Sequence, residues 1–229
     1  MAIRRKMARI QPALVAPSSG EEIQLATVGS TESIAISLKA GPTSPRSTAG
    51  HRQERRWIKD AQRGSAEALE ALYRRHWPWA HRAAYLVVHD RAAAEDIAQE
   101  AFLAAVRALD RFDRRRPFGP WLHRIVVNRA IDWARARSLR AEELETEPDR
   151  APSSHLEAPE PQRSRPYSES VVAALASLSP EHRAVVVLRY LLEYTPGEIA
   201  EALELPRGTV NSRLRRALDR LRKQLEGER

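Results

Sequence analysis

Residues 193–225 read EYTPGEIAEALELPRGTVNSRLRRALDRLRKQL, and they predict two helices joined by a short turn. Thr195 and Glu198 have the spacing of a capping box, which starts the first helix. The second helix is expected to begin at Thr209, and Gly208 before it to adopt the left-handed backbone that such a turn often needs. Apolar residues at helical spacing give the second helix a stripe that faces the core. They are Val210, Leu214, Ala217, Leu218, Leu221 and Leu225.

Basic side chains gather on the second of these helices. Residues 207–223 contain seven basic groups and one acidic group, Asp219. This is the layout of a helix-turn-helix, whose second helix enters the major groove of DNA. There Arg213 can bond guanine or phosphate, while Asn211 and Ser212 can reach base edges or the backbone. The alternative is an ordinary helical hairpin with a solvated arginine face.

The rest of the sequence shows helical patterns only, which predicts an all-α fold. Residues 1–50 contain no aromatic residue and are rich in Ser, Thr, Gly, Pro and Ala, so we expect a disordered N-terminal tail. Residues 141–166 hold five prolines, with 7 acidic and 3 basic groups, and predict a flexible acidic linker. Two small helical domains remain, residues 51–140 and 167–229.

Start signals and breakers place the helices within these domains. Ser179 and Pro180 supply a cap residue followed by proline at the first helical position. Pro78 is expected to kink or divide the second helix of the first domain. The expected helices lie near 53–62, 65–89, 91–110 and 118–139 in the first domain, and near 168–177, 180–193, 196–203 and 209–225 in the second.

Composition excludes several classes of function. The 229-residue chain has no cysteine, which excludes disulfides, cysteine–zinc sites, iron–sulfur clusters and thiol catalysis. No apolar run approaches the ~20 residues of a membrane helix, and no signal-peptide core is present, so we expect a cytoplasmic protein without membrane insertion. The seven histidines lack metal-binding spacing and no glycine-rich nucleotide loop occurs. We therefore expect no catalytic residue, no metal and no cofactor.

Charge is unevenly distributed along the chain. The net charge is +8, and residues 51–140 carry 19 basic against 11 acidic groups. A basic surface favours polyanionic partners by a route that does not depend on their sequence. A soluble surface that is merely rich in arginine explains the charge equally well.

Two helices of the first domain carry polar stripes. In residues 90–109, Asp96, Gln99 and Glu100 share one face of an alanine-rich helix; such a stripe faces solvent or binds a partner. In residues 111–140, Pro117, Gly119 and Pro120 form a rigid loop before the helix. Trp121, Arg124, Asn128, Asp132 and Arg135 then recur on one side.

The second stripe, in residues 111–140, contains the side-chain types that bind unstacked bases. Phosphates need arginine, bases need a flat surface such as Trp121, and base edges need donors and acceptors such as Asn128. A core tryptophan beside solvated arginines is the alternative, and Leu122, Val126 and Trp133 suit the core.

Three blocks in one order resemble bacterial RNA polymerase sigma factors of the extracytoplasmic-function group. They read LYRRHWPWAHRAAYLVVHDRAAAEDIAQEAFLAAVRALDRFD (72–113), PFGPWLHRIVVNRAIDWAR (117–135) and LSPEHRAVVVLRYLLEYTPGEIAEALELPRGTVNSRLRRALDRLR (178–222). They are similar to region two and region four of that family. The resemblance implies a promoter-specificity subunit that binds core RNA polymerase, recognises the minus-thirty-five and minus-ten elements of promoter DNA and supports melting. It also implies an inhibitory anti-sigma factor as a candidate partner.

The resemblance also implies roles for particular residues. Asp96, Gln99 and Glu100 lie in the block that docks on the largest polymerase subunit. The loop and helix at residues 113–139 correspond to the part that captures the melted, single-stranded minus-ten element, and the residues implied there are Trp121, Asn128 and Arg135, with Arg124 on phosphate. The helix from Thr209 corresponds to the reader of the duplex minus-thirty-five element, and the residues implied there are Arg207, Thr209, Asn211, Ser212, Arg213 and Arg216.

Two rival functions are open to the same sequence. A stand-alone helix-turn-helix regulator would bind a duplex operator without polymerase, usually as a dimer, and would not need the loop and helix at residues 113–139. A nuclease would need a metal-binding or acid–base cluster, for which the scattered histidines give no support.

Overall fold

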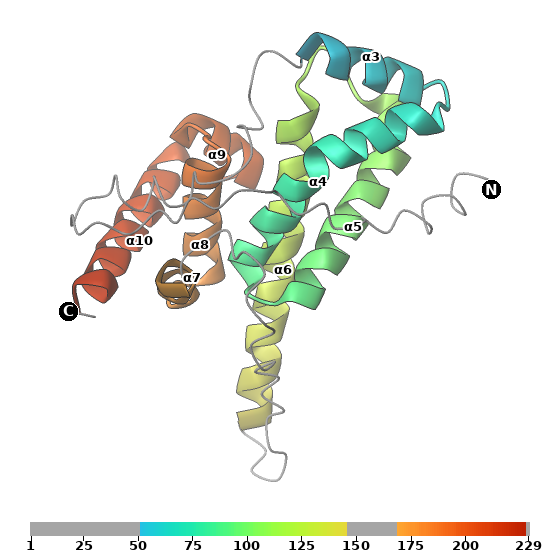
Figure 1. Ribbon diagram of the computed structural model, residues 1–229. Helices are drawn as coiled ribbons and strands as arrows, with labels where there is room; N and C mark the ends of the chain where they lie inside the picture. The colour runs from blue at the N-terminus through green and yellow to red at the C-terminus, as the bar shows by residue number, and fades with distance from the viewer. Residues whose placement is uncertain (1–50, 146–168, 228–229) are drawn as a thin grey trace, which may run out of the picture.

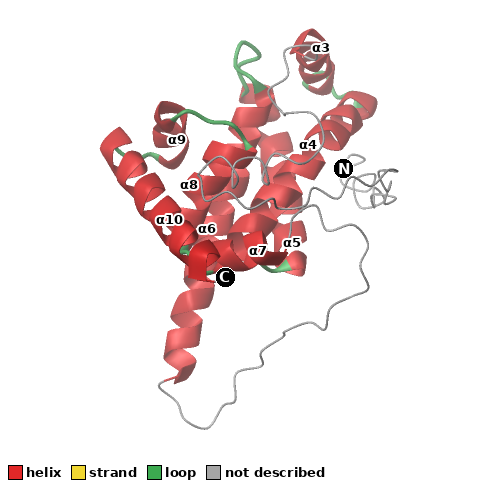
Figure 2. Cartoon of the chain, turned by 60° about the vertical axis from the view of Figure 1, so that its left-hand side comes forward, coloured by secondary structure: helices red, strands yellow, loops and turns green. Residues whose placement is uncertain are grey.

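The computed structural model describes residues 51–145 and 169–227, with side chains described for residues 51–140 and 171–224. The expectations for the N-terminal tail and for most of the acidic linker lie outside these residues. Helices and their connecting loops make up the described chain, and no strand occurs within it (Figure 2). The prediction of an all-α fold is confirmed.

The first helix group comprises α3 to α6, which lie together in Figure 1. Its core is alanine-rich where α5 meets α4 and α6, since Ala94, Ala98, Ala101 and Ala105 are fully buried. Small side chains let these helices approach closely. The bounds are α3 (His51–Ala61), α4 (Ala66–Val88), α5 (Arg91–Ala108), a 3-10 turn η2 (Leu109–Arg111) and α6 (Phe118–Glu145).

Side-chain caps set the starts of two of these helices. The Ser65 hydroxyl accepts from the backbone N–H of Ala68 at the start of α4, and the Asp90 carboxylate accepts from that of Ala93 at the start of α5. The helix α4 runs through Pro78 without interruption, so of the two expected effects of Pro78, a kink or a division, the division does not occur. The turns flanking Pro78 pack against the core, which holds the helix together despite the missing backbone donor.

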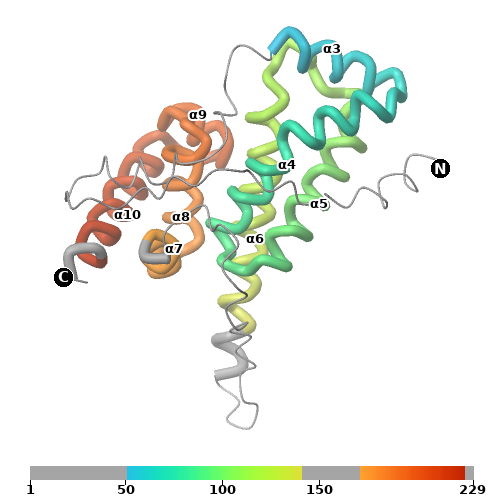
Figure 3. Tube along the Cα trace, in the orientation of Figure 1, coloured from blue at the N-terminus to red at the C-terminus, as the bar shows by residue number. Residues whose placement is uncertain are grey.

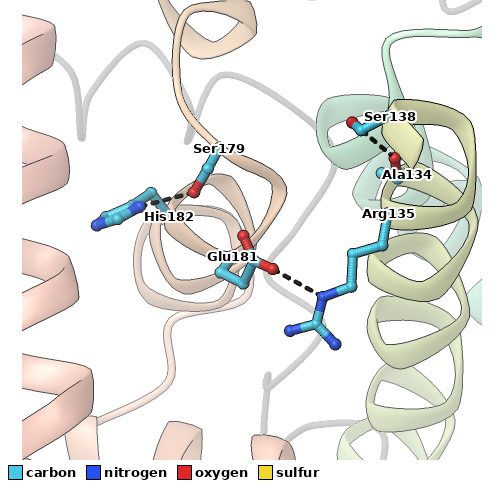
Figure 4. Close-up of polar contacts among 6 residues, drawn as sticks. All are labelled: Ala134, Arg135, Ser138, Ser179, Glu181 and His182. Atoms are coloured by element: carbon cyan, nitrogen blue, oxygen red, sulfur yellow. Dashed lines mark hydrogen bonds and ion pairs between the residues drawn. The ribbon is translucent and has the colours of Figure 1, made fainter. Parts of the chain in front are cut away.

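The second helix group comprises α7 to α10 and contains the helix-turn-helix. Thr195 and Glu198 form the complete capping box at the start of α9, as the sequence predicts. Ser179 is the N-cap of α8, but its hydroxyl bonds to His182 Nδ1 at 2.7 Å instead of to the backbone (Figure 4). The bounds are α7 (Glu169–Ala176), α8 (Pro180–Val186), a π-helical turn η3 (Val187–Leu191), α9 (Pro196–Leu203) and α10 (Arg207–Gly227).

The turn between α9 and α10 differs from the expectation. The left-handed residue is Glu204, with φ of 54°, and not Gly208, which lies in the first turn of α10. Because the chain has already turned at Glu204, the Pro206 carbonyl can accept the first α10 bond, from the N–H of Thr209. Of the predicted buried stripe of α10, Val210, Leu214, Ala217 and Leu221 are buried and Leu218 is partly buried, whereas the Leu225 side chain lies outside the described residues.

Two other helices differ from the expected ones, α6 in its length and α8 in the turn that follows it. The helix α6 continues to Glu145, into residues assigned by sequence to the linker, because Ala, Glu and Leu in residues 141–145 favour helix. The expected helix at 180–193 is instead α8 followed by the π-helical turn η3.

The two helix groups pack against each other. Helices α8 and α9 contact α6, and α8 also contacts α4, as the trace in Figure 3 shows for the orange and red helices beside the green and yellow ones. This packing brings the candidate residues of both groups to one interface.

Candidate nucleic-acid interface

Helix α10 carries the six residues expected to read duplex DNA, and three of them are exposed. Arg207, Asn211 and Arg216 are exposed, as a reading helix requires. Thr209, Ser212 and Arg213 are partly buried. The Ser212 hydroxyl donates to the Thr209 carbonyl at 2.9 Å, so its oxygen remains as an acceptor.

His182 lies close to the arginine face of α10. Its pKa is lowered by burial and by the positive charges of Arg213, Arg216 and Arg220. The imidazole therefore stays neutral at pH 7 and adds no further charge to this face. Its position shows that α8 borders the arginines that sequence assigns to DNA.

Trp121 lies on an aromatic cluster at the start of α6. Its ring centroid is 4.6 Å from that of Phe112 and 5.5 Å from that of Phe118. Phe112 and Phe118 are buried, while Trp121 is partly exposed. The cluster gives the indole a fixed orientation, which suits a surface on which a base stacks.

The other three residues expected to hold the minus-ten element contact the second helix group. Arg135 Nε donates to Glu181 Oε1 at 2.7 Å (Figure 4). Arg124 pairs with the Glu204 carboxylate. The Asn128 amide donates to the Ala202 carbonyl at 3.5 Å, the outer limit of a hydrogen bond.

Burial alone would raise the pKa of Glu181, but the Arg135 hydrogen bond and charge, with bonds from Ser179 and the helix backbone, hold this pKa below its usual range. Glu181 is therefore ionised at neutral pH, and the pair with Arg135 is ionic.

A cavity of about 270 Å³ opens between the two helix groups. Arg135 and Asn128 line it from α6, and Arg213 lines it from α10. The structure thus brings together members of both sets of candidate DNA-binding residues, which sequence separates by more than 70 positions. The two acidic partners Glu181 and Glu204 were missed, because surface glutamates on short helices give no sequence signal of a distant arginine.

Two further contacts join the helix groups. His123 Nδ1 lies 3.3 Å from the Tyr194 hydroxyl, and the His123 ring is buried. Arg183 donates to the Val87 carbonyl at 2.6 Å, at the end of α4.

The His89 side chain lies close to Arg183. Burial and the charge of Arg183 lower the pKa of His89 to about 4. Neither ring nitrogen of His89 has a hydrogen-bond partner among the described residues.

The acidic stripe on α5 is exposed. Asp96, Gln99 and Glu100 point away from the core, and Leu103 beside them is 38% exposed, which is unusual for a large apolar side chain. Glu100 pairs with Arg129 of α6 at 2.7 Å. Acidic groups around an apolar residue suit the docking surface that the family resemblance implies.

Within residues 51–140 and 171–224, no group of three or more acidic or histidine side chains could hold a metal ion. Among the described helices, none is long and apolar enough to cross a membrane.

Comparison with known proteins identifies the family. The model of Sigma-70 region 2 matches residues 72–140, and that of Sigma-70, region 4 matches residues 174–223. ECF RNA polymerase sigma factor SigW of Bacillus subtilis is 32% identical over 176 residues, which cover 73% of this chain and 94% of SigW. The chain belongs to the ECF RNA polymerase sigma factors. It is a promoter-specificity subunit, and the stand-alone regulator is not favoured.

Other relatives agree with this assignment of the sigma factor. The RNA polymerase sigma-H factor of Pseudomonas aeruginosa is 33% identical over 186 residues, which cover 76% of this chain and 94% of that protein. CnrH, solved in complex with the cytosolic domain of CnrY, has a TM-score of 0.56 and 28% identity, covering 77% of this chain and 99% of that one. RpoE of Bartonella quintana, at 22% identity and a TM-score of 0.55 over 70% of this chain and 98% of that one, shares the fold.

Proposed function

We propose that this sigma factor binds one promoter at two elements, through two domains at residues 51–140 and 167–229. The exposed face of α10 reads the duplex minus-thirty-five element through Arg207, Thr209, Asn211, Ser212, Arg213 and Arg216. The α6 surface holds the melted minus-ten strand, with Trp121 stacking on a base, Asn128 reading a base edge, and Arg124 and Arg135 binding phosphate.

The main support for this proposal is that two arginines of α6 form ion pairs with glutamates of the second helix group. Arg124 and Arg135 already bind Glu204 and Glu181, in charge-assisted bonds of the kind they would make to phosphate. Because one guanidinium cannot serve both partners fully, DNA binding requires the helix groups to separate. Promoter opening then draws its free energy from preferential binding of the melted strand and not from a reaction catalysed by this chain.

The α5 stripe of Asp96, Gln99 and Glu100 is the proposed polymerase-docking surface. Helix α5 lies on the opposite side of the first helix group from α8 to α10 in Figure 1, and the three side chains of the stripe are exposed, so the second helix group leaves them accessible. The protein acts in the cytoplasm, where its polymerase and DNA lie, and needs no cofactor of its own.

A protein partner of the anti-sigma type is also proposed. The solved CnrH is in complex with the cytosolic domain of CnrY, and 28% of its residues match this chain. A partner of this kind would act by holding the two DNA-binding surfaces away from the promoter.

Run-off transcription tests the function directly. Purified full chain is added to core RNA polymerase on fragments of the source genome, and start sites are mapped. We expect new, discrete start sites that depend on the chain. Absence of start-site selection, together with tight operator binding by the chain alone in a gel shift, would overturn the proposal in favour of a stand-alone regulator.

A further inference from the structure

A histidine and an arginine meet where the end of α4 contacts α8. His89 is the residue that ends α4, and Arg183 lies in α8. The Arg183 guanidinium donates to the Val87 carbonyl of α4 at 2.6 Å and to the Leu178 carbonyl of its own helix group at 3.0 Å. This contact joins the two helix groups through residues that are assigned neither to DNA nor to polymerase.

The Arg183 guanidinium caps the carboxyl end of α4. The last carbonyls of a helix have no partner within it, and they form the negative end of its dipole. Helix α4 has no basic residue in its own last turn, so this positive charge comes from the second helix group. The second bond, to Leu178, holds the guanidinium in place, and Arg183 cannot turn away from α4 without strain on that bond.

Backbone geometry holds His89 at the same end of α4. His89 has φ of 55° and ψ of 26°, the left-handed conformation that ends many helices. Its N–H donates to the Tyr85 carbonyl at 2.8 Å, and its ring lies edge-on to the Tyr85 ring with centroids 6.3 Å apart. The imidazole is therefore fixed at the boundary between the helix groups.

The His89 imidazole is buried there without a hydrogen-bond partner. Both ring nitrogens are inaccessible, and neither bonds to another residue in the part of the chain that the structure describes. Burial and the charge of Arg183 lower the pKa of His89 to about 4. An imidazolium at this place would have two N–H donors without acceptors and a second cation beside it, and both features oppose protonation while the groups stay packed.

The acidic groups around His89 already have partners. The Asp90 carboxylate, at the start of α5, accepts from Arg137 of α6 at 2.8 Å and from the backbone N–H of Ala93 at 3.0 Å. Glu181 of α8 pairs with α6. Neither carboxylate is thus available to compensate a charge on His89.

The other charged groups on the neighbouring elements are basic. Arg91 of α5, Arg137 of α6 and Arg189 of η3 are all exposed to solvent. Among the charges of the described residues, that of Arg183 alone contributes to the lowered pKa of His89. The sensitivity of His89 to protons is therefore set by one contact, which exists only while the second helix group lies against the first.

We propose that His89 is a proton-responsive contact that releases the second helix group from the first when the chain is acidified. In the separated arrangement, water solvates the imidazolium, and Arg183 leaves the Val87 carbonyl. Acid then also frees the α6 face that carries Arg124 and Arg135. That consequence for DNA rests on the proposed function of α6, whereas the release itself does not.

The direction and size of the effect follow from proton linkage. The pKa of His89 is lower in the packed arrangement than its ordinary value of 6.5, so packing is fully favoured above pH 6.5 and is weakened as the pH falls toward 4. If separation restores the ordinary pKa, the ratio of packed to separated chains should fall about twentyfold between pH 7 and pH 5.

Energy transfer in the full chain tests the proposal without DNA or polymerase. Dyes insensitive to pH are attached at Arg107→Cys in α5 and Lys223→Cys in α10, both exposed positions, and the transfer is followed from pH 7 to pH 5. The test variant is His89→Asn, which cannot titrate and tolerates the left-handed backbone. The matched control is His81→Gln, which removes another histidine of α4 with a lowered pKa, one that faces the charges of Glu95 and Arg91 on α5.

The natural chain and the control should separate on acidification, with a fall of about twentyfold in the packed-to-separated ratio. His89→Asn should change by less than about threefold over the same range. Arg183→Gln serves as a second test if His89→Asn does not fold. It should separate more than the natural chain at pH 7, because the cap on α4 is lost, and should depend less on pH, because the second cation is gone.

Circular dichroism at each pH distinguishes separation from unfolding. The inference is overturned if energy transfer in the natural chain is unchanged down to pH 5, if His89→Asn follows the natural chain, or if the helical signal is lost together with the transfer. Each of these results leaves the proposed function standing. Failure of the chain to select a start site in run-off transcription would instead contradict the proposed function and would not alter the dye measurement.

Discussion

Removing the two carboxylates that pair with α6 should shift the equilibrium between the two helix groups toward the separated arrangement. The variant is Glu181→Gln with Glu204→Gln, which keeps side-chain size and removes the charges facing Arg135 and Arg124. Glu70→Gln is the matched control, because Glu70 pairs with Arg74 within α4 and does not join the helix groups.

The magnitude follows from the exposure of these pairs. The Arg135 and Glu181 side chains are 53% and 23% exposed, and those of Arg124 and Glu204 are 42% and 75% exposed. Such pairs contribute roughly 0.2–1 kcal/mol each, so together they favour the closed arrangement by about 1 kcal/mol. That free energy is about a fivefold change in the ratio of closed to open chains.

Two measurements report this change. Since the chain has no cysteine, dyes can be attached at Arg107→Cys in α5 and Lys223→Cys in α10, both exposed, and their energy transfer follows the separation of the groups. The affinity of the free chain for a labelled dT20 strand should rise up to about fivefold in the variant, because the competent state is more populated. At 1 M salt, where charges are screened beyond about 3 Å, the natural chain and the variant should differ less.

A specific pattern of results would refute the reasoning. If the double variant matches Glu70→Gln and the natural chain in both energy transfer and strand affinity, the two ion pairs do not hold the groups together. If the groups separate but strand affinity is unchanged, Arg124 and Arg135 are not strand contacts, and the minus-ten surface lies elsewhere.

Three further predictions concern the other surfaces. Charge reversal by Asp96→Lys with Glu100→Lys should weaken core polymerase binding by more than tenfold in a titration. Because both side chains are exposed, the melting temperature measured by circular dichroism should stay close to that of the natural chain. Arg213→Ala should weaken binding of holoenzyme to upstream duplex by ~1–3 kcal/mol if it contacts a base, and unchanged promoter preference would remove Arg213 from the site. The pKa of His89, lowered to about 4 by burial and by Arg183, means that unfolded chains bind a proton that folded ones do not, so stability is full above pH 6.5 and falls as the pH drops toward 4. Between pH 7 and pH 5 the urea unfolding free energy should fall by about 2 kcal/mol more in the natural chain than in His89→Gln.

Most of the helices could be predicted from sequence because local chemistry sets them. The capping box at Thr195 and Glu198 forms as its spacing requires, and the alternation of apolar residues places Val210 and Leu214 in the core. Gly208 shows the limit of such rules. The left-handed turn residue was expected to be glycine, but Glu204 takes this conformation because it is the C-cap of α9, where the N–H groups of Glu204 and Leu205 both donate to the Ala200 carbonyl.

The interface between the helix groups could not be predicted, for a different physical reason. Its ion pairs join positions 46 and 80 residues apart, and each is a common surface arginine beside a common surface glutamate. Periodicity identifies which face of α6 carries Arg124 and Arg135, but not which helix covers that face. The sequence therefore predicted the α6 surface correctly as polar and basic, while the partner that occupies it depends on tertiary packing alone.

The two ion pairs of this interface are individually weak, which suits a subunit that must first find its polymerase and then its DNA. The docking stripe on α5 is exposed while Arg124 and Arg135 are paired, and α4 and α6 lie between α5 and the second helix group (Figure 1). Polymerase binding through α5 should therefore not depend on opening, and Glu181→Gln with Glu204→Gln should bind core polymerase within about twofold of the natural chain. Equilibrium titration of labelled chain with core polymerase measures this, with Glu70→Gln as control. A change beyond fivefold in the double variant alone would mean that polymerase selects the open chain, and that docking and opening are one coupled step.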